Sequence, residues 1–191
     1  MVAPATIRAR NAVMWTRDDC HFLERSGLLP ERWELVEGEI ISKMGTNRPH
    51  AMFAKRMDVW LTRVFGADFV LPACSIDVAP GDNPTSKPEP DILVVRRPAA
   101  ELGLNPTAAD IALLIEVSDT TLDHDLGPKA GLYARAGIAD YWVVDINAGL
   151  IHQHRNPTMT GYASVQVVPA GQRLSPLAQP AAELDPATLF G

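Results

Sequence analysis

Two apolar stretches in the middle of the chain each carry a single carboxylate. They are PDILVV at residues 90–95 and ALLIEVS at residues 112–118. Side chains alternate between the two faces of a strand, so Asp91 and Glu116 each share a face with the leucine two positions away. Removing an ionised carboxylate from water is costly unless a cation or hydrogen-bond donors compensate. The pattern therefore predicts two strands whose carboxylates lie at the margin of a core and share a positively charged partner.

The first half of the chain also shows helical and hairpin patterns. Thr16 is a good N-cap for a short helix through Leu23, and residues 33–44 read as a hairpin with its turn at Glu37-Gly38-Glu39. Apolar residues then recur at helical spacing between positions 49 and 65, which predicts an amphipathic helix that ends at Gly66.

In the second half, short strands are predicted at residues 69–71, 75–78, 141–145, 150–154 and 162–168. Pro128 and Gly137 bracket a further helix, since proline favours the first helical position and glycine the position after the last. This mixture of strands and helices indicates an α/β (α+β) fold.

Length and composition fit one domain. The chain has 191 residues, of which 47% are hydrophobic, enough for a sizeable core. We expect residues 1–15 to form a loose leader and residues 16–191 a single domain. Its Pro/Ala-rich tail should wrap the surface and tuck in Leu189 and Phe190. Neither a membrane-spanning run nor a signal peptide is evident, so a cytoplasmic protein is expected.

Charge and cysteine content limit the classes of protein and of site that fit this sequence. The formal net charge of −6 argues against a protein that coats nucleic acid, but clustered acidic metal ligands would themselves lower the charge. Cys20 and Cys74 are isolated, which favours inert thiols over a zinc or redox site. Local cations that could contact phosphates are Arg48, Lys55, Arg56, Arg63, Arg96 and Arg97.

The candidate chemistry centres on Asp91 and Glu116. Oxygen ligands suit Mg²⁺ or Mn²⁺ better than zinc. Lys129 falls in the first turn of the predicted 128–137 helix, where the helix dipole disfavours a cation. We interpret it as reaching back to the carboxylates, to orient a water or to stabilise negative charge on a phosphate.

Other polar residues leave alternatives open. Any one of Glu34, Glu37 and Glu39 could complete a metal shell. His50 begins the long helix as a cap, a surface residue or an accessory site residue. The pair His152 and His154 is a weak metal signal without a third ligand. Ser118 lacks the surroundings of a nucleophilic serine, so a metal-independent hydrolase is disfavoured.

The order of these motifs resembles the Uma-type family of restriction-endonuclease-like proteins, formerly a domain of unknown function and placed in the PD-(D/E)XK nuclease superfamily. The resemblance rests on four segments, WELVEGE at 33–39, PDILVV at 90–95, IEVS at 115–118 and KAGLYARAGIADYWVVD at 129–145. It covers residues 16–168 and implies a mixed β-sheet flanked by helices, with an acidic site at one end that binds Mg²⁺ or a similar ion.

By this resemblance, Asp91 is the proline-aspartate carboxylate and Glu116 is the glutamate of the E-x-K element. Ser118 stands where the superfamily has lysine, and Lys129 from the following helix supplies that lysine instead. The family's E-L-x-x-G-E pattern selects Glu39 as the early carboxylate, and His50 matches a histidine that begins the long helix.

The resulting functional hypothesis is a metal-dependent endonuclease that hydrolyses phosphodiester bonds, with DNA as the expected nucleic acid. Asp91, Glu116 and Glu39 would hold Mg²⁺ or Mn²⁺, while Arg48 or Lys55 would contact backbone phosphates. We expect a homodimer, because cutting both strands of a duplex needs two centres. The alternative is an inactive nuclease-fold protein that serves as a nucleic-acid-binding or assembly module.

Overall fold

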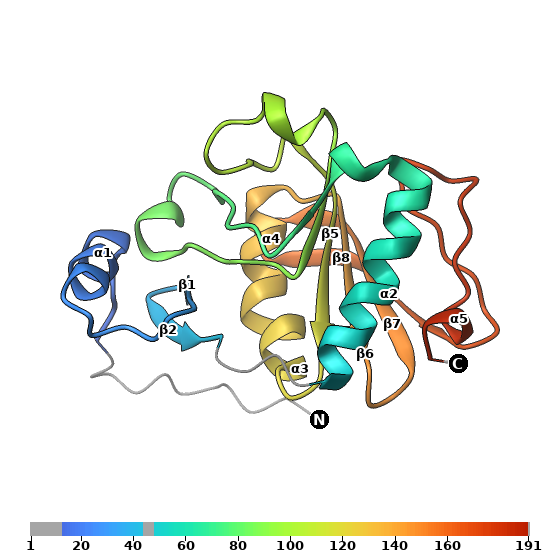
Figure 1. Ribbon diagram of the computed structural model, residues 1–191, viewed down its shortest axis with the longest axis horizontal. Coiled ribbons are helices and arrows are strands. Elements are labelled where there is room, and N and C mark those ends of the chain that lie inside the picture. Colours follow the sequence, from blue (N-terminus) through green and yellow to red (C-terminus); the bar gives the residue numbers. More distant parts are fainter. Residues whose placement is uncertain (1–12, 44–47, 191) are drawn as a thin grey trace.

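The computed structural model describes residues 13–43 and 48–190 (Figure 1). Most of the predicted leader, residues 1–12, lies outside the described residues. The helices are α1 (Arg17–Arg25), α2 (Arg48–Phe65), α3 (Leu122–His124), α4 (Ala130–Ala136) and α5 (Ala187–Phe190). The strands are β1 (Trp33–Val36), β2 (Glu39–Ser42), β3 (Val70–Pro72), β4 (Ile92–Val95), β5 (Ile111–Ser118), β6 (Asp140–Asp145), β7 (Leu150–Thr158) and β8 (Gly161–Pro169).

Six strands form one mixed sheet in the order β3-β4-β5-β6-β7-β8. The pair β5 and β6 is parallel and the remaining neighbours are antiparallel. All eight residues of β5 and all six of β6 are buried. A parallel pair with both faces covered accounts for their nearly continuous apolar sequences. The predicted α/β class with a mixed sheet flanked by helices is confirmed.

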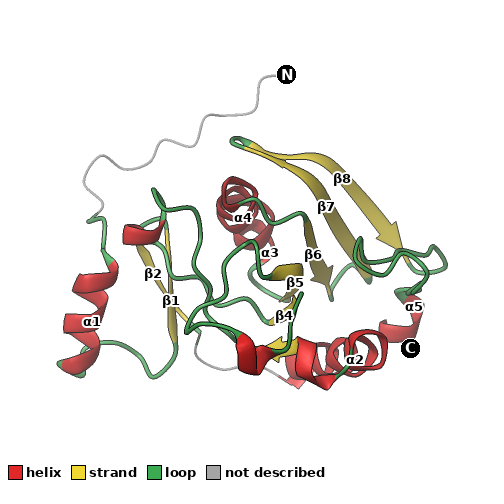
Figure 2. Ribbon diagram, turned by 90° about the horizontal axis from the view of Figure 1, so that it is seen from above, coloured by secondary structure: helices red, strands yellow, loops and turns green. Residues whose placement is uncertain are grey.

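Helices cover the two faces of this sheet separately (Figure 2). On one face, Met57 and Leu61 of α2 pack against apolar side chains that include Ile115 and Trp142. On the other face, α4 contributes Tyr133 to a second core. None of the helices in the described ranges is long and apolar enough to cross a membrane.

The hairpin predicted at residues 33–44 is confirmed, and it forms a small sheet of its own from β1 and β2. Glu37 (φ 49°) and Gly38 (φ 79°) are both left-handed, as a tight two-residue turn requires, and Glu39 already belongs to β2. Backbone hydrogen bonds between Leu35 and Lys87, 2.7 and 3.2 Å long, attach the hairpin to the segment that precedes β4.

Both ends of the described chain have the structure that the sequence patterns predict. The α1 helix has the predicted Thr16 N-cap, completed by Asp19 in a capping box. At the other end, Leu189 is buried, and the ring of Phe190 lies 5.0 Å from that of Phe53 on α2. The predicted docking of the apolar tail is confirmed.

The helix after β5 begins earlier than predicted. Helical backbone starts at Leu122 and passes through a π-helical turn, η4 (Asp125–Lys129), before α4. Pro128 therefore lies inside the helix instead of at its first position. Proline has no N–H to donate and crowds the preceding turn, and the wider π turn relieves this conflict. Lys129 lies beyond the first turn, so the predicted position of Lys129 in the first turn was wrong.

The strand predicted at residues 75–78 is not present. Its apolar side chains are buried as expected, but its backbone pairs with loops instead of a neighbouring strand. The Asp77 amide donates to the Pro106 carbonyl (2.9 Å), and the Val78 amide donates to Oδ1 of Asn83 (2.8 Å). Local polar partners thus replace a strand ladder.

Candidate metal-dependent active site

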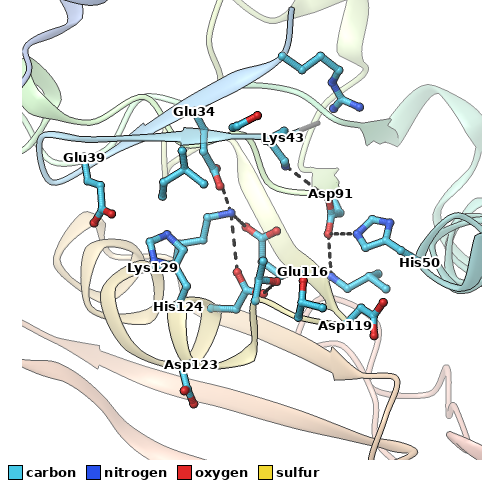
Figure 3. Close-up of a pocket in the computed structure, with 17 residues that line it drawn as sticks. Glu34, Glu39, Lys43, His50, Asp91, Glu116, Asp119, Asp123, His124 and Lys129 are labelled. Atoms are coloured by element: carbon cyan, nitrogen blue, oxygen red, sulfur yellow. Dashed lines mark hydrogen bonds and ion pairs between the residues drawn. The ribbon is translucent and has the colours of Figure 1, made fainter. Parts of the chain in front are cut away.

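A cavity of about 470 Å³ opens at the end of the sheet where β4 begins and β5 ends. The hairpin, the start of α2 and the α3–η4 segment complete its walls (Figure 3). Charged and polar side chains dominate the lining: Arg32, Glu34, Glu39, Lys43, His50, Asp91, Glu116, Asp119, Thr121, Asp123, His124, Asp125 and Lys129.

Antiparallel pairing of β4 and β5 brings Asp91 and Glu116 together. Ile92 lies opposite Ile115, so the same register continued by one residue places Asp91 opposite Glu116. The Val117 amide donates a hydrogen bond to Oδ2 of Asp91 (2.8 Å). Two carboxylates distant in sequence therefore reach the same edge of the sheet.

Asp91 is held in its ionised form. Nε2 of His50 lies 3.1 Å from Oδ2, and Nζ of Lys43 lies 3.5 Å from Oδ1. Burial alone would raise the pKa of Asp91. The His50 hydrogen bond, the Lys43 charge and the Val117 amide outweigh burial, so the pKa falls well below its usual range. Figure 3 shows His50 pointing from α2 toward Asp91.

The pKa of Glu116 is shifted in the opposite direction to that of Asp91. Both Nζ of Lys129 and the hydroxyl of Tyr133 donate to its Oε1 atom, each at 2.8 Å. Burial raises the pKa of Glu116 to about 8. The Lys129 charge opposes that rise, and the nearby carboxylates of Asp91 and Asp125 add to it.

Lys129 is the cation at the centre of the cavity wall. Its side chain is only 2% exposed, and Nζ lies 2.9 Å from Glu34, 2.8 Å from Glu116 and 3.9 Å from Asp125. Burial would lower the pKa of Lys129, but these three carboxylates reverse that effect and raise it. Lys129 is therefore a protonated ammonium at neutral pH, which suits charge stabilisation and not proton abstraction.

Three polar side chains four residues apart, at positions 125, 129 and 133, face β5 from the η4–α4 helix. The hydroxyl of Ser118 donates to Oδ2 of Asp125, which also accepts from Thr121 (2.7 Å). Ser118 thus anchors the start of the helix that carries Lys129.

The remaining sequence candidates lie farther from this centre. Glu39 lines the cavity but is exposed, and its side chain makes no hydrogen bond or ion pair within residues 13–43 and 48–190. Figure 3 shows it apart from Asp91. Arg48 is exposed at the first residue of α2, outside the cavity lining.

Glu34 is the hairpin glutamate that contacts Lys129, whereas the family pattern selected Glu39 as the early carboxylate. The Oε2 atom of Glu34 accepts from Lys129 and from the Glu89 amide (3.1 Å). The signal was present in the sequence, since Glu34 is a lone carboxylate among apolar residues in WELV, as Asp91 and Glu116 are in their strands. Tyr133 and Asp125 carried a weaker signal, their four-residue spacing from Lys129.

Two further cations were not anticipated. Lys43, just after β2, contacts Asp91, and Nη2 of Arg32 lies 2.5 Å from Oε1 of Glu89. Both line the cavity, and the Arg32 side chain is 47% exposed. Both are basic groups at the cavity that an anionic ligand could reach.

The donor set fits a hard divalent cation. Four carboxylates, at positions 34, 91, 116 and 125, lie around the two ammonium groups of Lys43 and Lys129, so negative charge is in excess. Within the described ranges no three His, Cys, Asp or Glu side chains already form a metal cage. Mg²⁺ usually keeps several waters and uses one or two carboxylates, which Asp91 and Glu116 can supply.

Among solved structures, the fold is similar to "a putative nuclease belonging to DUF820" from Anabaena variabilis ATCC 29413. The TM-score is 0.65 at 18% sequence identity, and the match covers 92% of this chain and 97% of the other. This similarity establishes the shared fold. No curated protein matches the chain.

The sequence also matches a family model. The Uma2 model, described as "Putative restriction endonuclease", matches residues 23–187. This range includes the hairpin, the whole six-stranded sheet and every carboxylate around Lys129. The family resemblance seen in the sequence motifs is confirmed, and the chain belongs to the Uma2 family.

Proposed function

We propose that this protein is a metal-dependent endonuclease that hydrolyses phosphodiester bonds, with DNA as its substrate. The observation that carries the proposal is the meeting of Asp91 and Glu116 at one cavity edge, beside the buried cation Lys129. Three segments far apart in the sequence converge there, and the surrounding charge favours a divalent cation. Membership of the family supports the same reaction class.

Asp91 and Glu116 would hold Mg²⁺ or Mn²⁺, with Glu39 available from the hairpin wall through water. When bound, the ion supplies Lewis-acid stabilisation of a phosphate oxygen and lowers the pKa of a coordinated water. His50, Lys43 and the Val117 amide keep Asp91 ionised and fix its orientation. Lys129 fixes Glu116 and would stabilise the negative charge that develops on the phosphate.

The phosphate backbone of the DNA would contact cations at the cavity and on the exposed surface of α2. Arg32 stands at the cavity, while Arg48 and Lys55 are exposed on α2, the helix that carries His50 into the site. Contacts of this kind orient the duplex without reading its sequence. They also allow a protein with a net charge of −6 to bind DNA through a local basic surface.

The test is cleavage of supercoiled plasmid with Mg²⁺ or Mn²⁺, in parallel with single-stranded DNA and RNA. Asp91→Asn and Glu116→Gln should each lower the rate by about 100-fold or more. Asp123→Asn is the matched control, because Asp123 lines the same cavity but contacts none of these groups. It should cleave like the wild type.

Each outcome discriminates between hypotheses. Loss of nicking in both site variants, but not in Asp123→Asn, supports the nuclease. Absence of cleavage by a folded wild type that binds nucleic acid would favour the alternative, an inactive nuclease-fold binding or assembly module. Sedimentation of the wild type with and without a DNA duplex tests the expected homodimer.

A further inference from the structure

We infer that Tyr133 is a positioning residue for Glu116. It orients the carboxylate so that one oxygen binds protein donors and the other is left for a ligand in the cavity. The inference rests on the proposed metal-dependent function and concerns a side chain that does not line the cavity. Tyr133 is fully buried in the core between α4 and the sheet. Its hydroxyl reaches Glu116 from behind the cavity wall.

The hydrogen bonds around Glu116 are asymmetric. Lys129 and Tyr133 both donate to Oε1 at 2.8 Å, whereas Oε2 accepts no hydrogen bond from any residue that the structure describes. Figure 3 shows Oε2 on the side of the carboxylate that faces Asp91. One oxygen is therefore occupied by protein donors, and the other is left for a ligand in the cavity.

Lys129 alone would not fix this orientation. An ammonium group is a compact charge with rotatable donors, and here it also binds Glu34 at 2.9 Å. The Tyr133 hydroxyl is directional, and its ring is held in edge contact with Tyr141, with centroids 5.1 Å apart. The rigid aromatic donor sets the angle of the carboxylate, while the ammonium supplies the charge.

Helix geometry explains how both donors reach one oxygen. Lys129 ends the π turn and Tyr133 lies four residues later in α4, so the two side chains project from the same helix face. Groups that hold a metal ligand in place commonly contribute about 10- to 100-fold to metal affinity or activity. Tyr133 is expected to act in this way.

The experiment compares Tyr133→Phe with Tyr141→Phe. The Tyr141 hydroxyl is also buried, but it donates to the backbone carbonyl of Asp125 (2.9 Å) and not to Glu116. Each variant loses one hydroxyl from the same aromatic cluster, so Tyr141→Phe reports the cost of that loss to the fold. Thermal unfolding first establishes that both variants are folded.

The decisive readouts are the Mn²⁺ dissociation constant from calorimetry and the separate kcat and KM values for DNA cleavage. For Tyr133→Phe we expect Mn²⁺ affinity and kcat to fall about 10-fold, with KM for DNA unchanged. For Tyr141→Phe we expect both to match the wild type. Wild-type Mn²⁺ affinity in Tyr133→Phe, or an equal loss in both variants, would overturn the inference.

The calorimetric readout separates this inference from the proposed function. If the wild type binds Mn²⁺ but cleaves no nucleic acid, the nuclease proposal fails, and the change in Mn²⁺ affinity still decides the role of Tyr133. If the wild type cleaves and Tyr133→Phe behaves identically, only the role of Tyr133 is rejected. A wild type that binds no Mn²⁺ rejects both.

Discussion

The ammonium of Lys129 lies 2.9 Å from Oε2 of Glu34, and this buried ion pair joins the β1–β2 hairpin to the helix that follows β5. The hairpin is a separate two-stranded sheet, yet it supplies one of the carboxylates that hold the central cation. The position of the hairpin and the charge balance at Glu116 are therefore linked through Lys129.

The first prediction compares the two glutamates of the hairpin. Glu34→Gln removes the charge beside Lys129 but keeps an oxygen that can accept from the Glu89 amide. It should lower cleavage by about 10- to 100-fold. Glu39→Gln, at an exposed position, should cause a smaller loss. Steady-state rates on one plasmid substrate measure both, and a larger effect at Glu39 would reverse their proposed importance.

The second prediction concerns Lys129 and stability. Lys129→Met leaves Glu34, Glu116 and Asp125 buried together without their shared cation. Breaking a buried ion pair from one side costs about 3–5 kcal/mol, so the free energy of unfolding should drop by that amount. Urea denaturation without metal measures it. Adding Glu34→Gln should recover part of the loss, and no recovery would mean that the carboxylates do not repel one another.

Much of the fold could be predicted from the sequence, because local patterns determine it. Periodicity or turn residues predicted the 49–65 helix, the 33–44 hairpin and the strands that carry Asp91 and Glu116. The start of the helix at Leu122 could not be read, because a π turn that accommodates Pro128 departs from the usual proline rule.

The candidate site was only partly predictable, for a different reason. Asp91, Glu116 and Lys129 lie around one cavity as expected, and His50, whose role the sequence left open, lines it too. The contact between Lys129 and Glu34, in contrast, depends on how a separate hairpin docks, which no local pattern specifies. Buried polar residues on apolar strands were the dependable signal, and applying it to WELV would have selected Glu34.

The third prediction is a pH dependence of metal-free stability. Burial raises the pKa of Glu116 to about 8 from its ordinary value of 4.5, so the folded state binds this proton more tightly than the unfolded state. The contribution of Glu116 to the free energy of unfolding is then fully present below about pH 4.5 and is lost as pH rises through 8. Glu116→Gln should remove this loss and raise the free energy of unfolding at pH 8 by more than about 1 kcal/mol.

The measurement is urea denaturation of both proteins in chelator between pH 5 and 9, taken as a difference. The difference is needed because burial lowers the pKa of His124 and His154, which gives the wild type an opposing gain in stability as pH rises through their range. A difference between variant and wild type that stays constant with pH would contradict the raised pKa of Glu116.

The fourth prediction addresses the basic surface on α2. Arg48→Gln and Lys55→Gln should each weaken binding of a DNA duplex similarly for all sequences. Each should also reduce the slope of log K against log salt by about 1. Binding is measured with Ca²⁺ in place of Mg²⁺. Arg25→Gln is the control, since Arg25 is exposed in the last turn of α1, which lies away from α2 in both views (Figures 1 and 2). Unchanged slopes in both α2 variants would remove this helix from the DNA-contacting surface.

The central ammonium comes from the helix after β5, while Ser118 on the strand itself only anchors that helix. This origin has a consequence for biosynthesis. A chain still emerging from the ribosome can pair β4 with β5 before residues 122–136 have docked, but it then has carboxylates without the lysine that holds them. Under the proposed nuclease function, cleavage would therefore require the docked helix, and a chain that lacks this helix would have an incomplete site.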